Sequence, residues 1–172
     1  LPPAQVTWNP ALNFPDTGGL WNVSSNWAGA IGPSNVTTVI FNVLDAIPCT
    51  VTNAAFAKVV RMGLGGPGGT LIITNGGSLA CSSADEWNSI GMNNTGLMVV
   101  ENGGSASFGN HLWIGFEPTA DGTLIMNGGT VSVGQMFGLG WNGGKGTALI
   151  HGGTLNLSQW SASSPGSIAG TS

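Results

Sequence analysis

Seven carboxylates are the residues of this chain best suited to acid–base chemistry. They are Asp16, Asp45, Asp85, Glu86, Glu101, Glu117 and Asp121. Glycoside hydrolysis needs two carboxylates that face each other across a defined gap. Only Asp85, Glu86 and Glu117 are predicted to share a flank of the molecule, and they lie at different heights along the predicted strands. We therefore interpret the chain as a non-catalytic protein rather than an enzyme.

Metal and phosphate sites are not indicated either. His111 and His151 lie 40 residues apart, with no cysteine or carboxylate at ligand spacing, so zinc is not expected. The glycine-rich stretch 63–69 is not followed by Lys-Ser/Thr and a helix, as a phosphate loop would require. The dispersed acids do not form a calcium cage. We expect no cofactor and no metal.

The charge distribution narrows the choice of partners. The net charge is −4, and Lys58, Arg61 and Lys145 are the only basic residues. A nucleic-acid backbone requires clustered cations, so we expect no nucleic acid partner. The apolar runs are much shorter than the roughly 18–20 residues that cross a bilayer, so we expect no membrane insertion.

A repeated phrase predicts the architecture that positions these side chains. Its copies read GGTLIITNGGSLAC, GLMVVENGGSASF, GTLIMNGGTVSV and GTALIHGGTLNL, and they begin at positions 68, 96, 122 and 146. Their Gly-Gly pairs begin at positions 76, 103, 128 and 152, which gives steps of 27, 25 and 24 residues. Such a period, with apolar alternation on both sides of a glycine corner, is typical of a solenoid.

Each repeat is predicted to form one coil with three short parallel strands. The first strands are residues 70–74, 97–101, 123–126 and 147–150. The second strands place residues 79 and 81, 106 and 108, 131 and 133, and 155 and 157 inward. The third strands carry the triplets Ile-Gly-Met, Ile-Gly-Phe and Leu-Gly-Trp at 90–92, 114–116 and 139–141. A degenerate earlier coil is expected to use 39–43, 49–52 and 59–64 as its first, second and third strands.

The two cysteines, Cys49 and Cys81, occupy the same strand of successive coils in that registration. Neighbouring strands lie about 4.8 Å apart, which a disulfide tolerates. In an exported chain we predict a Cys49–Cys81 bridge. The alternative is two buried thiols acting as small apolar residues.

Residues 1–36 contain three tryptophans, five prolines and no repeat. A solenoid must cover its first coil, so we expect this segment to be an irregular N-terminal cap. The predicted fold is thus all-β, a single parallel β-helix of about five coils, with a cap at 1–36 and the solenoid at 37–172. The chain begins at Leu1 without a charged and apolar leader, and we interpret it as a mature protein whose export signal has been removed.

The sequence Gly19-Leu20-Trp21-Asn22, then Ser25-Asn26-Trp27, together with coils that read GxLxVxxGGxLxV, resembles glycine-rich β-solenoid exoproteins of bacteria. These are the proteins with autotransporter-type or surface-sorted repeats. The resemblance covers about residues 21–157 and implies a secreted or cell-surface location. The chain departs from that family because it shows neither a sorting helix nor a translocator barrel.

Aromatic residues and sequons supply further candidate sites. Trp87, Trp113 and Phe137 precede the triplets of successive coils, and Trp160 follows the last glycine corner. Exposed rings would lie against sugars, whereas inward-facing rings would pack in the core or against a subunit. Asn-x-Ser/Thr sequons are candidate glycosylation sites at Asn22, Asn35, Asn93 and Asn156.

The segment around Ile168 matches the third-strand position of a final coil that no further element covers. An uncovered coil presents unpaired backbone groups to a second molecule. We therefore expect a subunit that stacks on itself, end to end, in a filament or surface assembly. The expected contacts are Leu1, Trp8, Trp21, Trp27, Trp160 and Ile168. The alternative is a carbohydrate-binding module that uses the aromatic face, with a polysaccharide as its partner.

Overall fold

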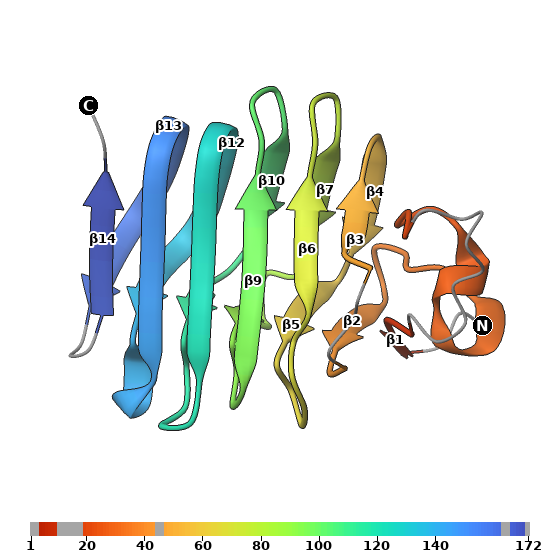
Figure 1. Cartoon of the computed structure of the whole chain (residues 1–172), viewed down its shortest axis with the longest axis horizontal. Coiled ribbons are helices and arrows are strands. Elements are labelled where there is room, and N and C mark those ends of the chain that lie inside the picture. The colour runs from red at the N-terminus through yellow and green to blue at the C-terminus, as the bar shows by residue number, and fades with distance from the viewer. Residues whose placement is uncertain (1–3, 10–18, 44–46, 163–165, 171–172) are drawn as a thin grey trace.

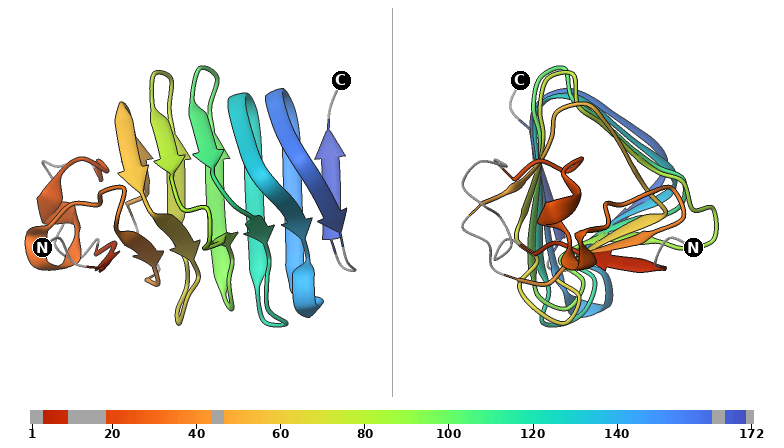
Figure 2. Two further views of the ribbon diagram at one scale, coloured as in Figure 1. Left: turned by 180° about the vertical axis from the view of Figure 1, so that it is seen from behind. Right: turned by 90° about the vertical axis from the view of Figure 1, so that its right-hand side faces the viewer.

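The computed structural model describes residues 4–9, 19–43, 47–162 and 166–170. It confirms the predicted fold, which is an all-β solenoid built from parallel strand pairs (Figure 1). Viewed along its axis, the molecule has a roughly triangular outline because each coil turns through three sheet faces (Figure 2). About five coils stack on one another, as the repeat period predicts.

Each face collects one strand from every coil. The first face contains β3 (Cys49–Val51), β6 (Thr70–Ile73), β9 (Thr95–Val100), the beginnings of β12 (Asp121–Leu139) and β13 (Lys145–Ala162), and β14 (Gly166–Gly170). The second face contains β4 (Ala54–Ala57), β7 (Ser78–Cys81), β10 (Ser105–Phe108) and the middle parts of β12 and β13. The third face contains β1 (Gln5–Thr7), β2 (Thr38–Phe41), β5 (Val59–Met62), β8 (Asn88–Ile90), β11 (Leu112–Ile114) and the ends of β12 and β13.

We number the coils by these strands. Coils one to three are β3–β4–β5, β6–β7–β8 and β9–β10–β11, while β12 forms coil four and β13 forms coil five. Short 3-10 turns accompany them: η2 (Ser24–Asn26) and η3 (Ala28–Ala30) lie before coil one, and η4 (Trp141–Gly143) lies between coils four and five.

The core consists of columns of apolar side chains that run along the solenoid. On the second face, Cys81, Phe108 and Val133 lie in register in successive coils and are at most 3% exposed. Alternate residues of each strand point inward, so one column forms at every second position. Each buried aliphatic or aromatic side chain stabilises the fold by roughly 1.5–3 kcal/mol. No coil could bury these residues without its neighbours.

The corner between the third face and the next coil depends on paired glycines. Gly115 has a φ of 69°, which places it in the left-handed region. A Cβ at Gly122 would lie 2.5 Å from the Gly115 nitrogen and 1.9 Å from the Ile90 carbonyl oxygen. The same close approach recurs where residues 63, 91 and 140 meet residues 68, 96 and 146. The glycine of each Ile-Gly-Phe-like triplet is therefore a corner residue that ends the third strand.

The N-terminal segment forms an aromatic core of its own. Between ring centroids, Trp27 lies 5.0 Å from both Trp8 and Trp21, and 6.0 Å from Phe41 at the end of strand β2. The Trp27 Nε1–H donates a hydrogen bond to the Trp21 carbonyl at 2.8 Å. The segment also pairs with the sheets, through β1 on β2 and through the Leu20–Thr50 bridge. This cap is thus continuous with the solenoid.

Three parts of the expected strand registration are wrong. Strand β2 stacks on β5 and therefore lies on the third face, although residues 39–43 were expected to form a first strand. Strand β3 stacks on β6, which makes the segment at Cys49 a first strand rather than a second. The segment around Ile168 is β14, which pairs with the first-face part of β13 and not with the third face. In each case the backbone pairing overrides a similarity of apolar pattern.

Candidate functional site

The corrected registration separates the two cysteines. Cys49 pairs with Leu71 on the first face, whereas Cys81 lies on the second face between Ala57 and Phe108. Both are buried, and no disulfide joins them. The predicted bridge is therefore not formed, because the two residues belong to different strand columns. Burial raises the pKa of the Cys81 thiol well above its usual range.

The aromatic residues of the third face form a continuous stack, which we call the aromatic ladder: Trp87, Phe116, Trp113 and Trp141. The centroid of Trp87 lies 4.5 Å from that of Phe116, with the rings nearly parallel. Trp113 lies 5.7 Å from Phe116 and 4.7 Å from Trp141. The Arg61 guanidinium covers Trp87 at 5.2 Å. Each ring is covered by a neighbour along the solenoid, so the ladder stabilises the stacking of coils.

This arrangement changes the set of candidate sugar-binding rings. Trp87 is half-buried and Trp113 is only 6% exposed, while Phe137 belongs to the core and is fully buried. None of these three residues therefore presents an exposed, flat ring face that could pack on a sugar. Phe116 and Trp141 were not among the predicted aromatic sites, although both are third residues of the triplets. The signal was present, because a left-handed glycine redirects the residue that follows it out of the strand.

A small charged cluster flanks the ladder. Glu86 forms ion pairs with Lys58 and, at 3.3 Å, with the Arg61 guanidinium. The hydrogen bond from Lys58 is the main cause that lowers the pKa of the Glu86 carboxyl, and the charges of Lys58 and Arg61 act in the same direction. This cluster joins coils one and two. All three side chains are at least 23% exposed, so its contribution to stability is small.

Other ionisable side chains contact neighbouring coils in the same way. Asp121 pairs with Lys145 at 2.7 Å, and Glu101 accepts two hydrogen bonds from the Asn127 amide at 3.2 Å. The His111 Nδ1 accepts a hydrogen bond from the Met136 N–H at 3.0 Å. Asp16 and Asp45 lie outside the described residues. Within the described ranges, no three His, Cys, Asp or Glu side chains gather as a metal site.

The C-terminal end of the described solenoid exposes its interior. Trp160 pairs with Phe137 and continues the inward column formed by Leu112 and Phe137. Leu112 and Phe137 are fully buried, but Trp160 is 63% exposed. Strand β14 covers only the first-face part of coil five, and within the described residues no strand stacks on its other two faces. Ile150, Leu155 and Leu157 are accordingly only partly buried.

The opposite end also presents apolar side chains. Ile31 and Val36 are 48% and 54% exposed, and Phe56 on edge strand β4 is 51% exposed. By contrast, Trp8, Trp21 and Trp27 are at most 1% exposed and hold the cap together. Their expected role as contacts between subunits is therefore wrong. Leu1 lies outside the described residues, and only the backbone of Ile168 is described.

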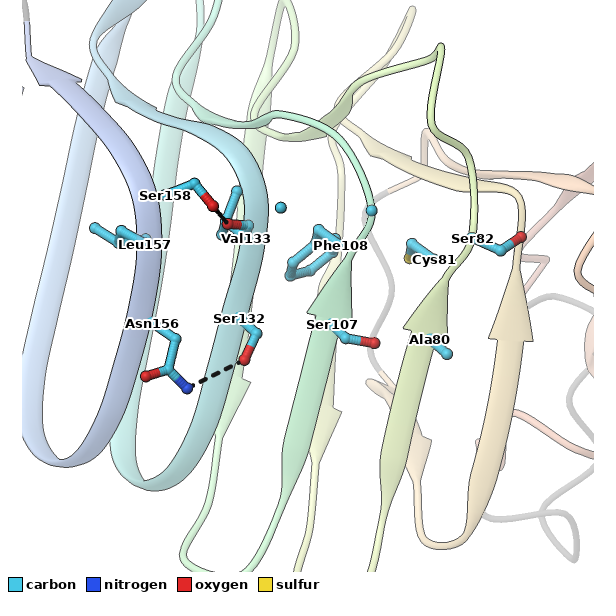
Figure 3. A pocket seen from close by; sticks show the side chains of 12 residues that line it. Ala80, Cys81, Ser82, Ser107, Phe108, Ser132, Val133, Asn156, Leu157 and Ser158 are labelled. Atoms are coloured by element: carbon cyan, nitrogen blue, oxygen red, sulfur yellow. Dashed lines mark hydrogen bonds between the residues drawn. The ribbon is translucent and has the colours of Figure 1, made fainter.

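A shallow groove of about 450 Å³ lies on the outer side of the second face (Figure 3). Figure 3 shows the side chains of Ser107 and Ser132 in a row across adjacent strands, with Asn156 beyond them. The Asn156 Nδ2 donates a hydrogen bond to the Ser132 Oγ at 3.3 Å. The groove spans coils two to five, and its lining side chains are uncharged.

The four predicted sequons all fall on described residues. Asn22, Asn35 and Asn156 are exposed, and Asn93 is half-buried. The Asn22 amide contacts the side chain of Asn53, and the Asn93 Oδ1 accepts a hydrogen bond from the Gly65 N–H at 2.9 Å. Glycosylation at these positions stays a prediction.

No protein-family model matches this chain, and neither the curated proteins nor the solved structures include a match to it. Among the described residues, no helix has the length and apolar character needed to span a bilayer.

Proposed function

We propose that this chain is a non-catalytic, extracellular structural protein whose solenoid stacks end to end on further copies of itself. The observation that carries the proposal is the exposure of Trp160 at a position whose equivalents in the two preceding coils are fully buried. The inward column of apolar side chains therefore ends in an exposed indole. A second apolar surface that packed against this indole would bury it as the equivalent side chains of the preceding coils are buried.

The location of the remaining exposed apolar side chains supports a head-to-tail contact. Ile31 and Val36 belong to the segment between η3 and β2, which comes before coil one, whereas Trp160 lies in coil five. Two different surfaces at opposite ends form a heterologous contact, which propagates into a filament when the rotation does not close. Among the described residues, no strand pairs with the outer edge of β14 or of the second- and third-face parts of β13, so their backbone donors and acceptors add to one of these surfaces.

The extracellular placement rests on the resemblance of the coils to bacterial exoproteins with glycine-rich repeats. Low charge is also consistent with stacking, since only 6% of residues are charged and the ends carry little mutual repulsion. The stacking contact is apolar and backbone-mediated, so we expect high salt not to dissolve it.

Particle size tests the proposal directly. Light scattering and electron microscopy of the 172-residue chain are expected to show concentration-dependent linear particles. Trp160→Ala should shorten them to monomers or short oligomers while the dichroism spectrum is retained. Trp141→Ala is the matched control, because this indole is also partly exposed but lies on the flank. A monomeric protein at high concentration, or equal effects of both substitutions, would contradict end-to-end stacking.

A further inference from the structure

The second face carries a regular row of side chains on its outer side. Ala80, Ser107, Ser132 and Asn156 occupy equivalent positions in coils two to five. Adjacent strands lie about 4.8 Å apart, so the row extends over roughly 14 Å parallel to the solenoid axis. Hydrogen-bonding groups at a constant spacing suit a ligand that itself repeats along its length.

Small residues line the groove beside this row. Ser82, Gly109, Gly134 and Ser158 follow the row in successive coils, so glycines stand in the middle and serines at both ends. A Cβ at Gly134 would lie 2.6 Å from the Gly109 carbonyl oxygen, and a Cβ at Gly109 would lie 2.9 Å from the Ser83 carbonyl oxygen. The floor of the groove is thus formed by closely packed backbone, and no larger residue can fill it.

The polar groups in the row retain hydrogen-bonding capacity. Asn156 uses an N–H of its amide to reach the Ser132 hydroxyl oxygen, and this bond leaves the hydroxyl hydrogen of Ser132 to donate elsewhere. Ser158 donates to the Val133 carbonyl oxygen at 3.4 Å and keeps its acceptor lone pairs. Mixed donors and acceptors of this kind suit hydroxyl groups, which both donate and accept.

An aromatic ring extends the same row. Phe56 pairs with Ala80 in the register of β4 and β7, so it occupies the coil-one position of the column. Its neighbours Ala55 and Ala57 are buried, whereas Phe56 is 51% exposed on the outer side. An exposed ring at the end of a row that holds two hydroxyls and an amide can pack against the C–H face of a sugar.

The groove is electrically neutral. Its lining comprises serine, glycine, alanine, asparagine and apolar residues, and the one ionisable group, the Cys81 thiol, is kept uncharged because burial raises its pKa. The whole chain carries a net charge of −4, which repels anionic polymers. We propose that this groove binds one chain of a neutral polysaccharide, laid along the solenoid axis with Phe56 against one of its rings. This site differs from the aromatic ladder and does not depend on end-to-end stacking.

Affinity gel electrophoresis of the full chain tests the proposal, because it detects weak binding to polymers. The neutral probes are hydroxyethylcellulose, galactomannan, xyloglucan and dextran, and the anionic probe is polygalacturonate. At least one neutral polymer should retard the protein, and polygalacturonate should not. Ser132→Glu should abolish the retardation, and Phe56→Ala should raise the dissociation constant roughly tenfold.

Thr123→Glu is the matched control, since Thr123 lies in the same strand β12 as Ser132 but on the outer side of the first face. It should bind like the unmodified chain. Ser107→Gln tests the groove without adding charge and should also weaken binding, whether or not Ser132→Glu folds. The proposal is overturned when no neutral polymer retards the protein, when polygalacturonate retards it equally, or when Thr123→Glu loses binding as much as the groove variants.

Discussion

The ring of Trp113 occupies the space in which a side chain at Gly138 would begin. The two residues pair in register on the third face, and a Cβ at Gly138 would lie 2.1 Å from the Cε3 and Cζ3 atoms of the indole. The glycine in coil four thereby accommodates the tryptophan of coil three. This fit explains how an indole on the outer side of a sheet is only 6% exposed.

Gly138→Ala is therefore expected to destabilise the fold by about 1–3 kcal/mol, since the added methyl must displace a packed ring. Urea denaturation followed by tryptophan fluorescence would measure the change. Gly152→Ala is the control, because the nearest atom to its Cβ would be 3.6 Å away. An equal loss of stability in both variants would indicate that glycine removal, and not the Trp113 contact, causes the effect.

The contact between Trp87 and Phe116 should contribute to stability through direct ring packing. In a double-mutant cycle, Trp87→Ala and Phe116→Ala should show a coupling free energy of about 0.5–1.5 kcal/mol. Thermal or chemical unfolding of the four proteins gives this value. Neither substitution should alter the retardation of the protein by a neutral polysaccharide. A loss of retardation in either variant would assign sugar binding to the aromatic ladder instead.

The Glu86 ion pairs predict a specific pH dependence. The pKa of Glu86 is lowered in the folded protein from its ordinary value of 4.5, so the carboxylate stabilises the fold above that value. The contribution should disappear as the pH falls through the lower folded-state pKa. We expect Glu86→Gln to cost about 0.2–1 kcal/mol at neutral pH and nothing in strong acid. Asp85→Asn, at an exposed neighbouring carboxylate outside both pairs, is the control. A cost that does not change with pH would contradict the assignment.

The Cys81 thiol should be unreactive in the folded protein. It is 2% exposed, and burial raises its pKa, so little thiolate is present at neutral pH. Peptide mapping should find Cys81 unmodified by iodoacetamide under native conditions and fully alkylated in denaturant without a reductant. Protection in denaturant would show instead that Cys81 is oxidised.

The repeat period was sufficient to predict the solenoid, because apolar alternation and Gly-Gly corners recur at nearly constant steps. It also predicted which side chains point inward, as Leu79, Ala106 and Val131 are all buried on the second face. In these coils the local pattern and the stacking of neighbours favour the same structure. Because the coils repeat the same geometry, the structure of one coil predicts the structure of the next.

The sequence was less informative where the repeat degenerates. A short run such as that around Cys49 alternates like any strand, and only its hydrogen-bonded partner decides which face it joins. Exposure depends on coil position as well, since Phe137 and Trp160 share one column but differ completely in burial. The groove was not predicted at all, because its serines and glycines are individually ordinary surface residues and become a site only when coils place them in a row.

The paired glycines at the third corner also determine where the chain tolerates changes in length. Residues 63, 91, 115 and 140 lie against residues 68, 96, 122 and 146, respectively. Each glycine pair therefore holds together the two ends of the short loop between the third strand of one coil and the first strand of the next. The two glycines of each pair are 5, 5, 7 and 6 residues apart in the sequence, so the loops already differ in size while the strands stay in register. Inserted peptides between Gly115 and Gly122 should therefore be displayed outside the coil, at a position suited to grafting epitopes or enzymes along the solenoid.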